Sequence, residues 1–359
     1  MQENSSKLQR HLPRVAVDVM GLDFGPEEML SGICSALKTD GHRFEKIYLV
    51  GDTAILTPLL DRYGFNDSSM VEFVHAPQVI EMQEKPIYTL KHKKDASMFR
   101  AIDLVKNGTV DAILSCGNTG SLMAGGTLKL GPIAGVERPA LASVIPTRQQ
   151  RFILIDVGAN PSSTAKHLAH NAILGSHYAQ AILEKTNPRV GLLTIGTEEG
   201  KGNEIVHAAH SILKNLPLPN FNYQGLIEGF HLFNNTVDVV VCDGFVGNIL
   251  LKTCESLFYH LKEYLKEELQ KNYMRKMGAF LSQGVFLNMK KQFSPEHFSG
   301  APLLGLNGWV FKSHGSSREK SIAGALRTCL RCLEAYDLKN VQNDIAATNL
   351  TIEKLKGEE

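Results

Sequence analysis

Short runs of β-branched and other apolar residues alternate along the chain with longer segments whose apolar residues recur at helical spacing. The short runs predict strands at residues 15–20, 46–51, 71–76, 110–115, 152–158, 189–196 and 237–244. The longer segments predict helices at 26–38, at 95–108 with Asp95 as N-cap, from 118, at 203–215 and at 245–261. This alternation predicts βαβ units and a mainly parallel sheet with helices on both faces. We expect one large α/β domain over 14–338, an N-terminal tail over 1–13, and a tail or weak helix over 339–359.

The rhythm of strands and helices breaks after residue 255, and residues 255–296 predict a projecting pair of helices. Between residues 275 and 291 there are four basic residues and no acidic one, and apolar residues are interleaved with the basic ones. The basic residues are Arg275, Lys276, Lys290 and Lys291, and the apolar ones are Met277, Phe280, Leu281, Val285, Phe286, Leu287 and Met289. This composition suits a membrane surface or an acidic carrier protein. It equally suits packing in a dimer interface or within the helix pair.

Small and polar residues, most of them with glycine, follow five of the predicted strands, at 21–26, 116–121, 158–161, 196–204 and 242–248. In open α/β sheets, ligands bind beyond the carboxyl ends of the strands. Glycine in one such loop indicates only a turn, whereas five loops of this kind predict a ligand site. The loop at 117–121, Gly-Asn-Thr-Gly-Ser, directly precedes a helix, and its N–H groups and hydroxyls favour an anion. Neither a Walker A motif nor a G-x-G-x-x-G motif is present there.

Several charged or nucleophilic residues near these loops have both functional and ordinary interpretations. Lys201, between two glycines, can reach a bound anion or be a solvated loop lysine. Lys94, in a charged run, and His314, in a loop, are candidate anion ligands that could equally be ordinary surface residues. Cys116 and Cys242 follow strands, where a nucleophilic thiol is conceivable but small buried packing is the better interpretation.

Composition narrows the class of protein. Of 359 residues, 38 are Lys or Arg and 37 are Asp or Glu, a balance that argues against a nucleic-acid binder. No apolar run approaches the roughly 18–20 residues that span a bilayer. The N-terminus lacks the apolar core of a secretory signal, and the scattered cysteines fit a reducing cytosol. The Cys329 and Cys332 pair has no second pair with which to complete a zinc site.

The ordered motifs KKDASM, SCGNTGSLMA, ERPAL, DVGAN, IGTEEGKGNE, CDGFVGN, GAPLLGL and HGSS resemble the bacterial phosphate acyltransferases of phospholipid synthesis. The resemblance covers residues 15–327. It implies a three-layer α/β/α sandwich related to isocitrate and isopropylmalate dehydrogenases and to phosphotransacetylases. It also implies a homodimer. From the scattered cysteines and the segment at 275–291 we expect a cytoplasmic location with peripheral contact at the inner face of the membrane. The implied reaction moves a fatty acyl group from acyl-acyl-carrier-protein to inorganic phosphate, and a glycerol-3-phosphate acyltransferase consumes the acyl phosphate.

The resemblance, the strand-end loops and the chemistry of the implied reaction together give the site residues that we predict. Lys201 and Asn248 are the candidate catalytic residues. The candidate phosphate- and substrate-binding residues are Asp18, Asp23, Lys94, Asn118, Thr119, Gly120, Ser121, Asn160, Gly202, Asn203, Asp243, His314 and Ser316. The family's first loop resembles D-A-M-G-G-D, and here Leu22 replaces the second glycine, which removes easy access to a positive φ.

Phosphate is already an anion, so the implied reaction needs a site that holds phosphate in line and donors that stabilise the oxyanion. We therefore expect direct attack on the thioester without an acyl-enzyme, and no metal or other cofactor. Three alternatives stay open at this point. They are a phosphotransacetylase-like enzyme using acyl-coenzyme A, a dehydrogenase on the related fold, and a non-catalytic scaffold for lipid enzymes.

Overall fold

The computed structural model describes residues 11–196, 198, 201–293 and 299–357. The chain divides into two compact units, unit 1 with Met1–Gly131 and Leu306–Glu334, and unit 2 with Pro132–Gly305 and Ala335–Glu359. The single domain expected over 14–338 stays a prediction. Most of the expected N-terminal tail, residues 1–10, lies outside the described residues.

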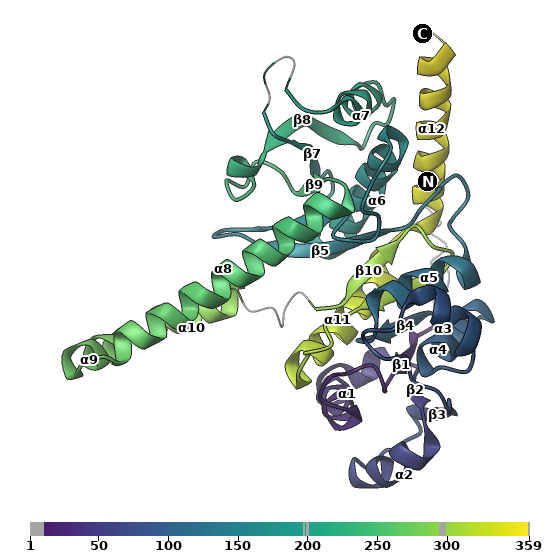
Figure 1. Ribbon diagram of the computed structural model, residues 1–359, viewed down its shortest axis with the longest axis vertical. Helices are drawn as coiled ribbons and strands as arrows, with labels where there is room; N and C mark the ends of the chain where they lie inside the picture. Colours follow the sequence, from purple (N-terminus) through teal and green to yellow (C-terminus); the bar gives the residue numbers. More distant parts are fainter. Residues whose placement is uncertain (1–10, 197, 199–200, 294–298, 358–359) are drawn as a thin grey trace, which may run out of the picture. The chain divides into compact units, whose positions relative to one another are not determined.

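Unit 1 is built on a parallel sheet with the strand order β3-β2-β1-β4-β11. Its strands are β1 (Arg14–Asp18), β2 (Lys46–Gly51), β3 (Val71–His75), β4 (Ala112–Ser115) and β11 (Trp309–Lys312). Its helices are α1 (Pro26–Asp40), α2 (Thr53–Arg62), α3 (Pro86–His92), α4 (Ser97–Lys106), α5 (Thr119–Leu130) and α11 (Glu319–Ala335), with a 3₁₀ turn η1 (Gly41–Arg43). Figure 1 shows α1 and α11 on the opposite face of this sheet from α4 and α5. Because both faces are covered, nearly every side chain of β1, β2 and β4 is buried, which explains their continuous apolar sequences.

Unit 2 has a mixed sheet with the order β10-β5-β6-β9-β7-β8, in which β5 pairs antiparallel with β10 and β6 and the other pairs are parallel. Its strands are β5 (Ala140–Pro146), β6 (Arg151–Ile155), β7 (Arg189–Thr194), β8 (Asn222–Glu228), β9 (Val239–Val241) and β10 (Ala301–Leu304). Its helices are α6 (Ala165–Leu183), α7 (Glu204–Lys214), α8 (Gly244–Gln270), α9 (Tyr273–Leu281), α10 (Gln283–Phe293) and α12 (Leu338–Gly357), with a 3₁₀ turn η2 (Gly229–His231). Helix α6 packs on β6 and β9 and forms much of the core.

The mainly parallel α/β architecture expected from the sequence is confirmed, and most predicted elements are present with ends moved by a few residues. Strands β5, β8, β10 and β11 had not been predicted. The predicted cap at Asp95 is wrong, because α4 begins at Ser97 after Ala96 and the Asp95 carboxylate instead pairs with Arg100 at 2.6 Å. The residues around Asp95 do not indicate clearly at which residue the helix begins.

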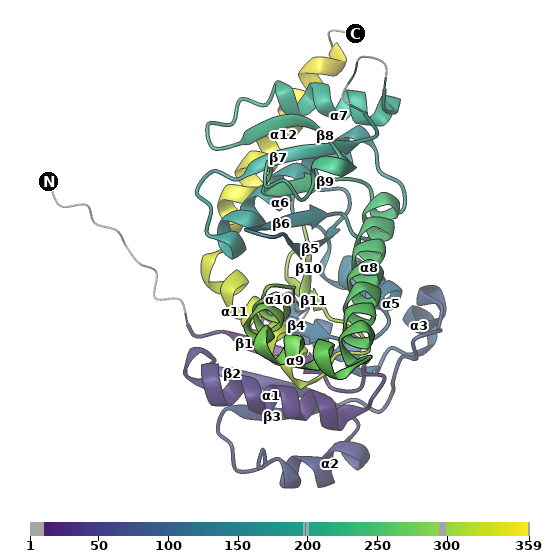
Figure 2. The ribbon, with the colours of Figure 1, turned by 90° about the vertical axis from the view of Figure 1, so that its left-hand side faces the viewer.

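The C-terminal segment differs most from its prediction. The sequence predicted a tail or weak helix over 339–359, whereas α12 is a helix of 20 residues that packs along α6 (Figures 1 and 2). Val341 and Ile345 are fully buried. Asp344 of α12 accepts a hydrogen bond from His177 at 2.8 Å, and Asn349 bonds to His170 at 2.9 Å. The helix is weakly amphipathic on its own and is stabilised by this packing.

The helical segment predicted over 255–296 also begins differently. Helix α8 runs unbroken from Gly244 through residue 255, and Figure 1 shows its far half, α9 and α10 extending away from the unit 2 sheet. The apolar side chains of Phe280, Leu281 and Val285 are exposed. The Arg275 guanidinium is held by Glu268 of α8. Residues 294–296 and the side chains of Lys290 and Lys291 lie outside the described structure. In the residues that the structure describes, no helix is long and apolar enough to cross a membrane.

The packing of α12 can be tested by stability. We expect Ile345→Ala to lower the free energy of unfolding by about 2–5 kcal/mol, because it leaves a cavity between α12 and α6. Urea denaturation followed by circular dichroism measures this change. The matched control is Lys354→Ala, at an exposed position of the same helix. A loss in Ile345→Ala no larger than in the control would show that α12 does not contribute to the core.

Candidate active site

In unit 1, the loops after β1 and β4 touch at the carboxyl end of the sheet. A Cβ placed on Gly21 would lie 2.6 Å from the backbone nitrogen of Gly117, so this approach requires glycine. Asp18, at the end of β1, is buried and accepts hydrogen bonds of 2.6 Å from the hydroxyls of Ser97 and Ser115. Burial raises the pKa of Asp18, and the hydrogen bonds from these hydroxyls offset part of that rise. The predicted site residue Asp18 therefore holds the loops together.

Leu22 follows in the same loop, where the family pattern has glycine. It does not adopt a positive φ, and its side chain is buried. The positive φ of this loop belongs to Gly25, at 82°, just before α1. The replacement of glycine by leucine is thus compatible with an unstrained backbone at that position.

The Gly-Asn-Thr-Gly-Ser loop forms the N-terminus of α5, as the sequence predicted. Asn118 caps the helix by accepting from the Ser121 backbone N–H at 2.9 Å. Its amide nitrogen donates to the carbonyls of Met82 at 2.8 Å and Glu84 at 3.0 Å. The Ser121 hydroxyl is buried against that of Thr89 at 3.0 Å. These side chains therefore position the loop.

The first-turn N–H groups of Thr119 and Gly120 lack an intrahelical acceptor, so they are the anion donors that this loop offers. Thr119 is exposed, whereas Gly120 packs against Pro86 so closely that a Cβ would lie 2.8 Å from that ring. The loop thus presents these backbone donors together with the exposed Thr119 hydroxyl.

The loop that contains His314 and Ser316 joins the same edge of unit 1. The backbone N–H of Asp23 donates to the Gly315 carbonyl at 3.0 Å, and Ser313 N–H donates to the Ser115 carbonyl at 3.0 Å. Asp23, Lys94, His314 and Ser316 are all exposed. Within unit 1, the structure therefore brings Asp23, His314 and Ser316 near the ends of β1 and β4.

Sequence reasoning missed Lys312 at the end of β11. Its ammonium group donates to the Cys116 carbonyl at 3.2 Å, and its charge acts on both Asp18 and Cys116. This places a cation among the strand-end loops of unit 1. The sequence does not predict β11 as a strand, so nothing in it indicates that Lys312 lies at a strand end.

In unit 2, one buried carboxylate organises the loop after β6. Asp156 accepts from the backbone N–H groups of Leu141, Gly158, Ala159 and Asn160, and from the Asn160 side chain at 2.9 Å. Burial raises the pKa of Asp156, and its hydrogen-bond donors oppose that rise. The carbonyl of Asn160 accepts from the Gly244 N–H at 2.8 Å, so the predicted site residue Asn160 ties this loop to the start of α8.

The first turn of α8 lies directly on this loop. A Cβ on Gly247 would stand 1.8 Å from the Asp156 carbonyl oxygen, so only glycine fits. Asp243 caps the helix by accepting from Val246 N–H at 2.8 Å. The exposed Asn248 donates to the Val157 carbonyl at 3.1 Å, and a primary amide has a second N–H that a ligand can use.

The loop between β7 and α7 carries Lys201. Its side chain is 55% exposed and pairs with Glu198 at 2.9 Å, which raises the pKa of Lys201. Gly202 has a φ of 102°, and Asn203 caps α7 by accepting from Val206 N–H at 2.8 Å. Gly202, Asn203 and Asp243 all border a cavity of about 860 Å³ within unit 2. The structure thus brings these three predicted residues to one cavity at the carboxyl end of the sheet.

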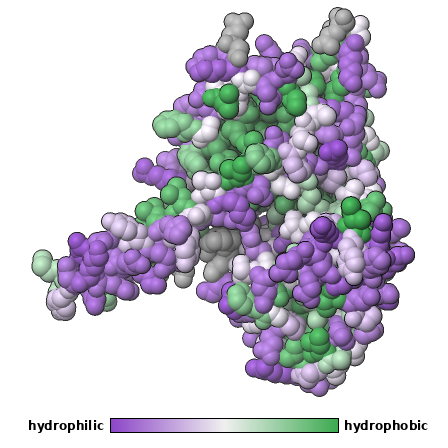
Figure 3. Space-filling model, in the orientation of Figure 1, coloured by the Kyte–Doolittle hydropathy of each residue, from purple (hydrophilic) through white to green (hydrophobic). Residues whose placement is uncertain are grey.

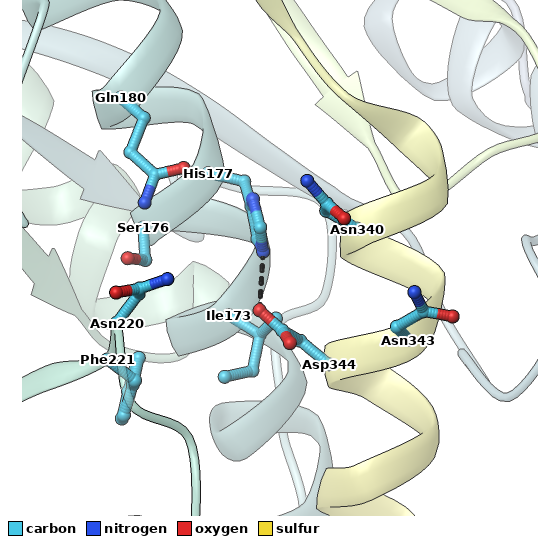
Figure 4. Close-up of a pocket in the computed structure, with 9 residues that line it drawn as sticks. All are labelled: Ile173, Ser176, His177, Gln180, Asn220, Phe221, Asn340, Asn343 and Asp344. Atoms are coloured by element: carbon cyan, nitrogen blue, oxygen red, sulfur yellow. Dashed lines mark hydrogen bonds and ion pairs between the residues drawn. The ribbon is translucent and has the colours of Figure 1, made fainter. Parts of the chain in front are cut away.

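A second, smaller cavity of about 220 Å³ lies between α6, α12 and the residues before β8. Figure 4 shows His177 of α6 turned toward Asp344 of α12 among amide and hydroxyl side chains. None of the predicted site residues borders this cavity. It is therefore separate from the candidate active site.

The cysteines at the strand ends do not provide a thiolate. Cys116 is buried, and burial raises its pKa to about 12. Burial likewise raises the pKa of Cys242 far above its usual range. Cys329 and Cys332 are fully buried free thiols. Among the described residues, no cluster of three or more His, Cys, Asp or Glu side chains could hold a metal ion.

Residues 13–336 match the family model described as fatty acid synthesis protein. The chain belongs to this family. A phosphate acyltransferase from Desulforudis audaxviator is 44% identical over 315 residues, which cover 88% of this chain and 90% of the relative. The family member described here is thus an acyltransferase, and its relatives carry the name phosphate acyltransferase.

Solved structures with low sequence identity share the fold. A phosphotransacetylase from Streptococcus pyogenes is 15% identical with a TM-score of 0.59, and the match covers 90% of this chain and 94% of that one. A putative 4-hydroxythreonine-4-phosphate dehydrogenase from Salmonella typhimurium is 13% identical with a TM-score of 0.50, over 89% and 99% of the two chains. The expected relation to phosphotransacetylase and dehydrogenase folds is confirmed at the level of fold.

The burial of the strand-end thiols predicts their reactivity. We expect Cys116 and Cys242 to resist iodoacetamide at pH 8, because an elevated pKa leaves the thiol protonated below that pKa. Peptide mass spectrometry after a short labelling pulse measures the modified fraction. Labelling in urea is the control, since unfolding exposes both thiols. Rapid modification of either residue in the folded protein would contradict their assignment as packing residues.

Proposed function

We propose that this acyltransferase moves a fatty acyl group from acyl-acyl-carrier-protein to inorganic phosphate and yields an acyl phosphate for phospholipid synthesis. The relatives named phosphate acyltransferase support the acceptor. The observation that carries the proposal is the exposed Lys201 ammonium at the carboxyl end of the unit 2 sheet, beside a cavity large enough for a substrate. Lys201 is charged at neutral pH and Glu198 raises its pKa further, which suits the binding of a phosphate dianion.

The proposed reaction is a direct displacement. A phosphate oxygen attacks the thioester carbonyl carbon, and the carbonyl oxygen becomes an oxyanion. The oxyanion then collapses, the carbon–sulfur bond breaks, and the carrier thiol leaves as a thiolate that takes a proton from water. A thiolate is a good leaving group, so little general acid catalysis is needed. The raised pKa values of Cys116 and Cys242 argue against an acyl-enzyme on either thiol.

Each predicted residue has a proposed part in this scheme. Lys201 binds phosphate and neutralises its charge, and Asn248 donates its second N–H to the oxyanion or to phosphate. In unit 1, the Thr119 and Gly120 amides bind an anionic group of the substrates. The remaining predicted residues position these groups or contact substrate, and they are Asp18, Asp23, Lys94, Asn118, Ser121, Asn160, Gly202, Asn203, Asp243, His314 and Ser316.

The partners follow from the same proposal. The carrier protein delivers the acyl chain, a second copy of the chain completes a homodimer, and a glycerol-3-phosphate acyltransferase consumes the product. The exposed apolar side chains of α9 and α10 support contact with a membrane surface. The dimer, the cytoplasmic location and the membrane contact remain predictions.

The activity is tested with purified protein. We expect acyl-acyl-carrier-protein to release carrier thiol only when phosphate is present, and hydroxylamine to trap the acyl phosphate as a hydroxamate. Acyl-coenzyme A in the same assay tests the alternative donor. If the protein prefers acyl-coenzyme A, then acyl-coenzyme A is the acyl donor and the donor that we propose is wrong. The absence of phosphate-dependent cleavage of either thioester would revive the scaffold interpretation.

In that assay, we expect Lys201→Ala to lower kcat/KM for phosphate by about 10²-fold, because a positioned charge is lost. Lys214→Ala is the matched control, since Lys214 is an exposed lysine at the other end of α7. If Lys201→Ala keeps near-normal turnover and phosphate affinity, Lys201 has no part in catalysis.

Lipid contact is tested separately. We expect the combined change of Phe280, Leu281, Val285 and Phe286 to Ser to reduce binding to anionic liposomes at least about tenfold, because the apolar area inserted into the interface is lost. Liposome sedimentation measures binding, and Leu257→Ser, an exposed position on α8, is the control. Undiminished binding would count against the lipid contact. Loss of the dimer together with unchanged liposome binding would assign these residues to the dimer interface.

A further inference from the structure

The cavity of about 860 Å³ in unit 2 has a wall that is not needed to bind phosphate. It lies beyond the ends of β7 and β8, between the first turns of α7 and α8. Its size falls within the range of about 300–1,000 Å³ that is typical of sites for small organic ligands. Inorganic phosphate would occupy only a small part of it.

One side of the cavity is a stripe on α8 that is apolar except for the hydroxyl of Thr253. Val246, Ile249, Leu250 and Thr253 all line it, and their spacing of three, four and seven residues places them on one face of the helix. Ile205 and Val206 of α7 line the cavity as well. Both helices therefore contribute apolar side chains to the cavity.

Much of this apolar surface is open to solvent within unit 2. Phe230 is 84% exposed, and Ile249 is 52% exposed. Figure 3 shows hydrophobic residues gathered on the face of unit 2 that bears β7 to β9. Large exposed apolar patches beside polar residues mark binding sites rather than ordinary surface.

The rim of the cavity is polar where it meets the candidate catalytic loop. Gly202 and Asn203 border it directly after Lys201, and Asp243 borders it at the start of α8. Ser163 also lines the cavity, and its buried hydroxyl has no hydrogen-bond partner in the described structure. Buried hydroxyls nearly always form hydrogen bonds. After rotation of its side chain, the Ser163 hydroxyl would donate a hydrogen bond to an acceptor atom of a ligand.

We propose that this cavity binds the fatty acyl chain of the thioester, with the chain along the α8 stripe and the carbonyl at the rim beside Lys201. This inference rests on the proposed function and specifies where its lipid substrate lies. An apolar wall that ends at a polar rim matches a molecule with a long hydrocarbon chain and one reactive carbonyl. Each methylene that leaves water adds about fourfold to affinity, so such a wall selects for longer chains.

The test is the dependence of activity on chain length. Ile249→Trp narrows the cavity at a half-exposed position where the larger ring does not enter the core. We expect the ratio of kcat/KM for a sixteen-carbon over a four-carbon acyl thioester to fall by about tenfold or more, mainly through KM, as about two methylenes lose their contacts. Leu257→Trp, exposed on α8 and outside the cavity, should leave the ratio unchanged.

A binding measurement separates this inference from the proposed function. We expect palmitate to displace cis-parinaric acid from the wild-type protein, and Phe230→Ser and Ile249→Trp both to weaken that binding. If the protein shows no turnover but palmitate still displaces cis-parinaric acid and both variants weaken that binding, the cavity binds the acyl chain and the proposed reaction is wrong. If turnover succeeds while both variants keep the wild-type chain-length ratio and palmitate affinity, the cavity does not hold the chain. A change in oligomeric state in these variants, with palmitate affinity unchanged, would instead show that a second copy covers the stripe.

Discussion

The buried carboxylate of Asp156 is the interaction on which the rest of unit 2 depends. It collects four backbone N–H groups and one side-chain amide from β5 and from its own loop. A charged group is costly to bury unless donors surround it, so the loop must close around the carboxylate in one conformation. Asn160 and Gly244 then fix the start of α8, and Gly247 allows that helix to lie directly on the loop.

Asp18 has a comparable role in unit 1. It satisfies its carboxylate with two serine hydroxyls from neighbouring elements, and this brings the loop after β1 to the loop after β4. The close contact of Gly21 with Gly117 follows from that arrangement. Both units therefore use a buried aspartate at a strand end to hold the loops at the carboxyl edge of their sheets.

Many of the polar residues in the strand-end loops stabilise local structure. Asn118, Asn203 and Asp243 each cap a helix. Capping turns the first N–H groups of these helices toward the carboxyl edge of their sheets, where an anion can meet them. Lys201 and Asn248 in unit 2 cap no helix, and they are the two residues for which we propose a role in the chemistry.

The sequence by itself determined the alternating α/β architecture, the buried parallel strands and the loops that carry the polar residues, because these follow from local periodicity and turn chemistry. The ordered motifs also identified the family. Only the tertiary structure decided that Asp18 and Asp156 are internal anchors, because Ser97 and Ser115 reach Asp18, and Leu141 reaches Asp156, from other elements of the fold. It also decided that α12 is part of the core, since its buried residues depend on α6. Lys312 and the α8 stripe were missed for the same reason: their surroundings come from segments far apart in the sequence, and no local pattern records which segments will meet.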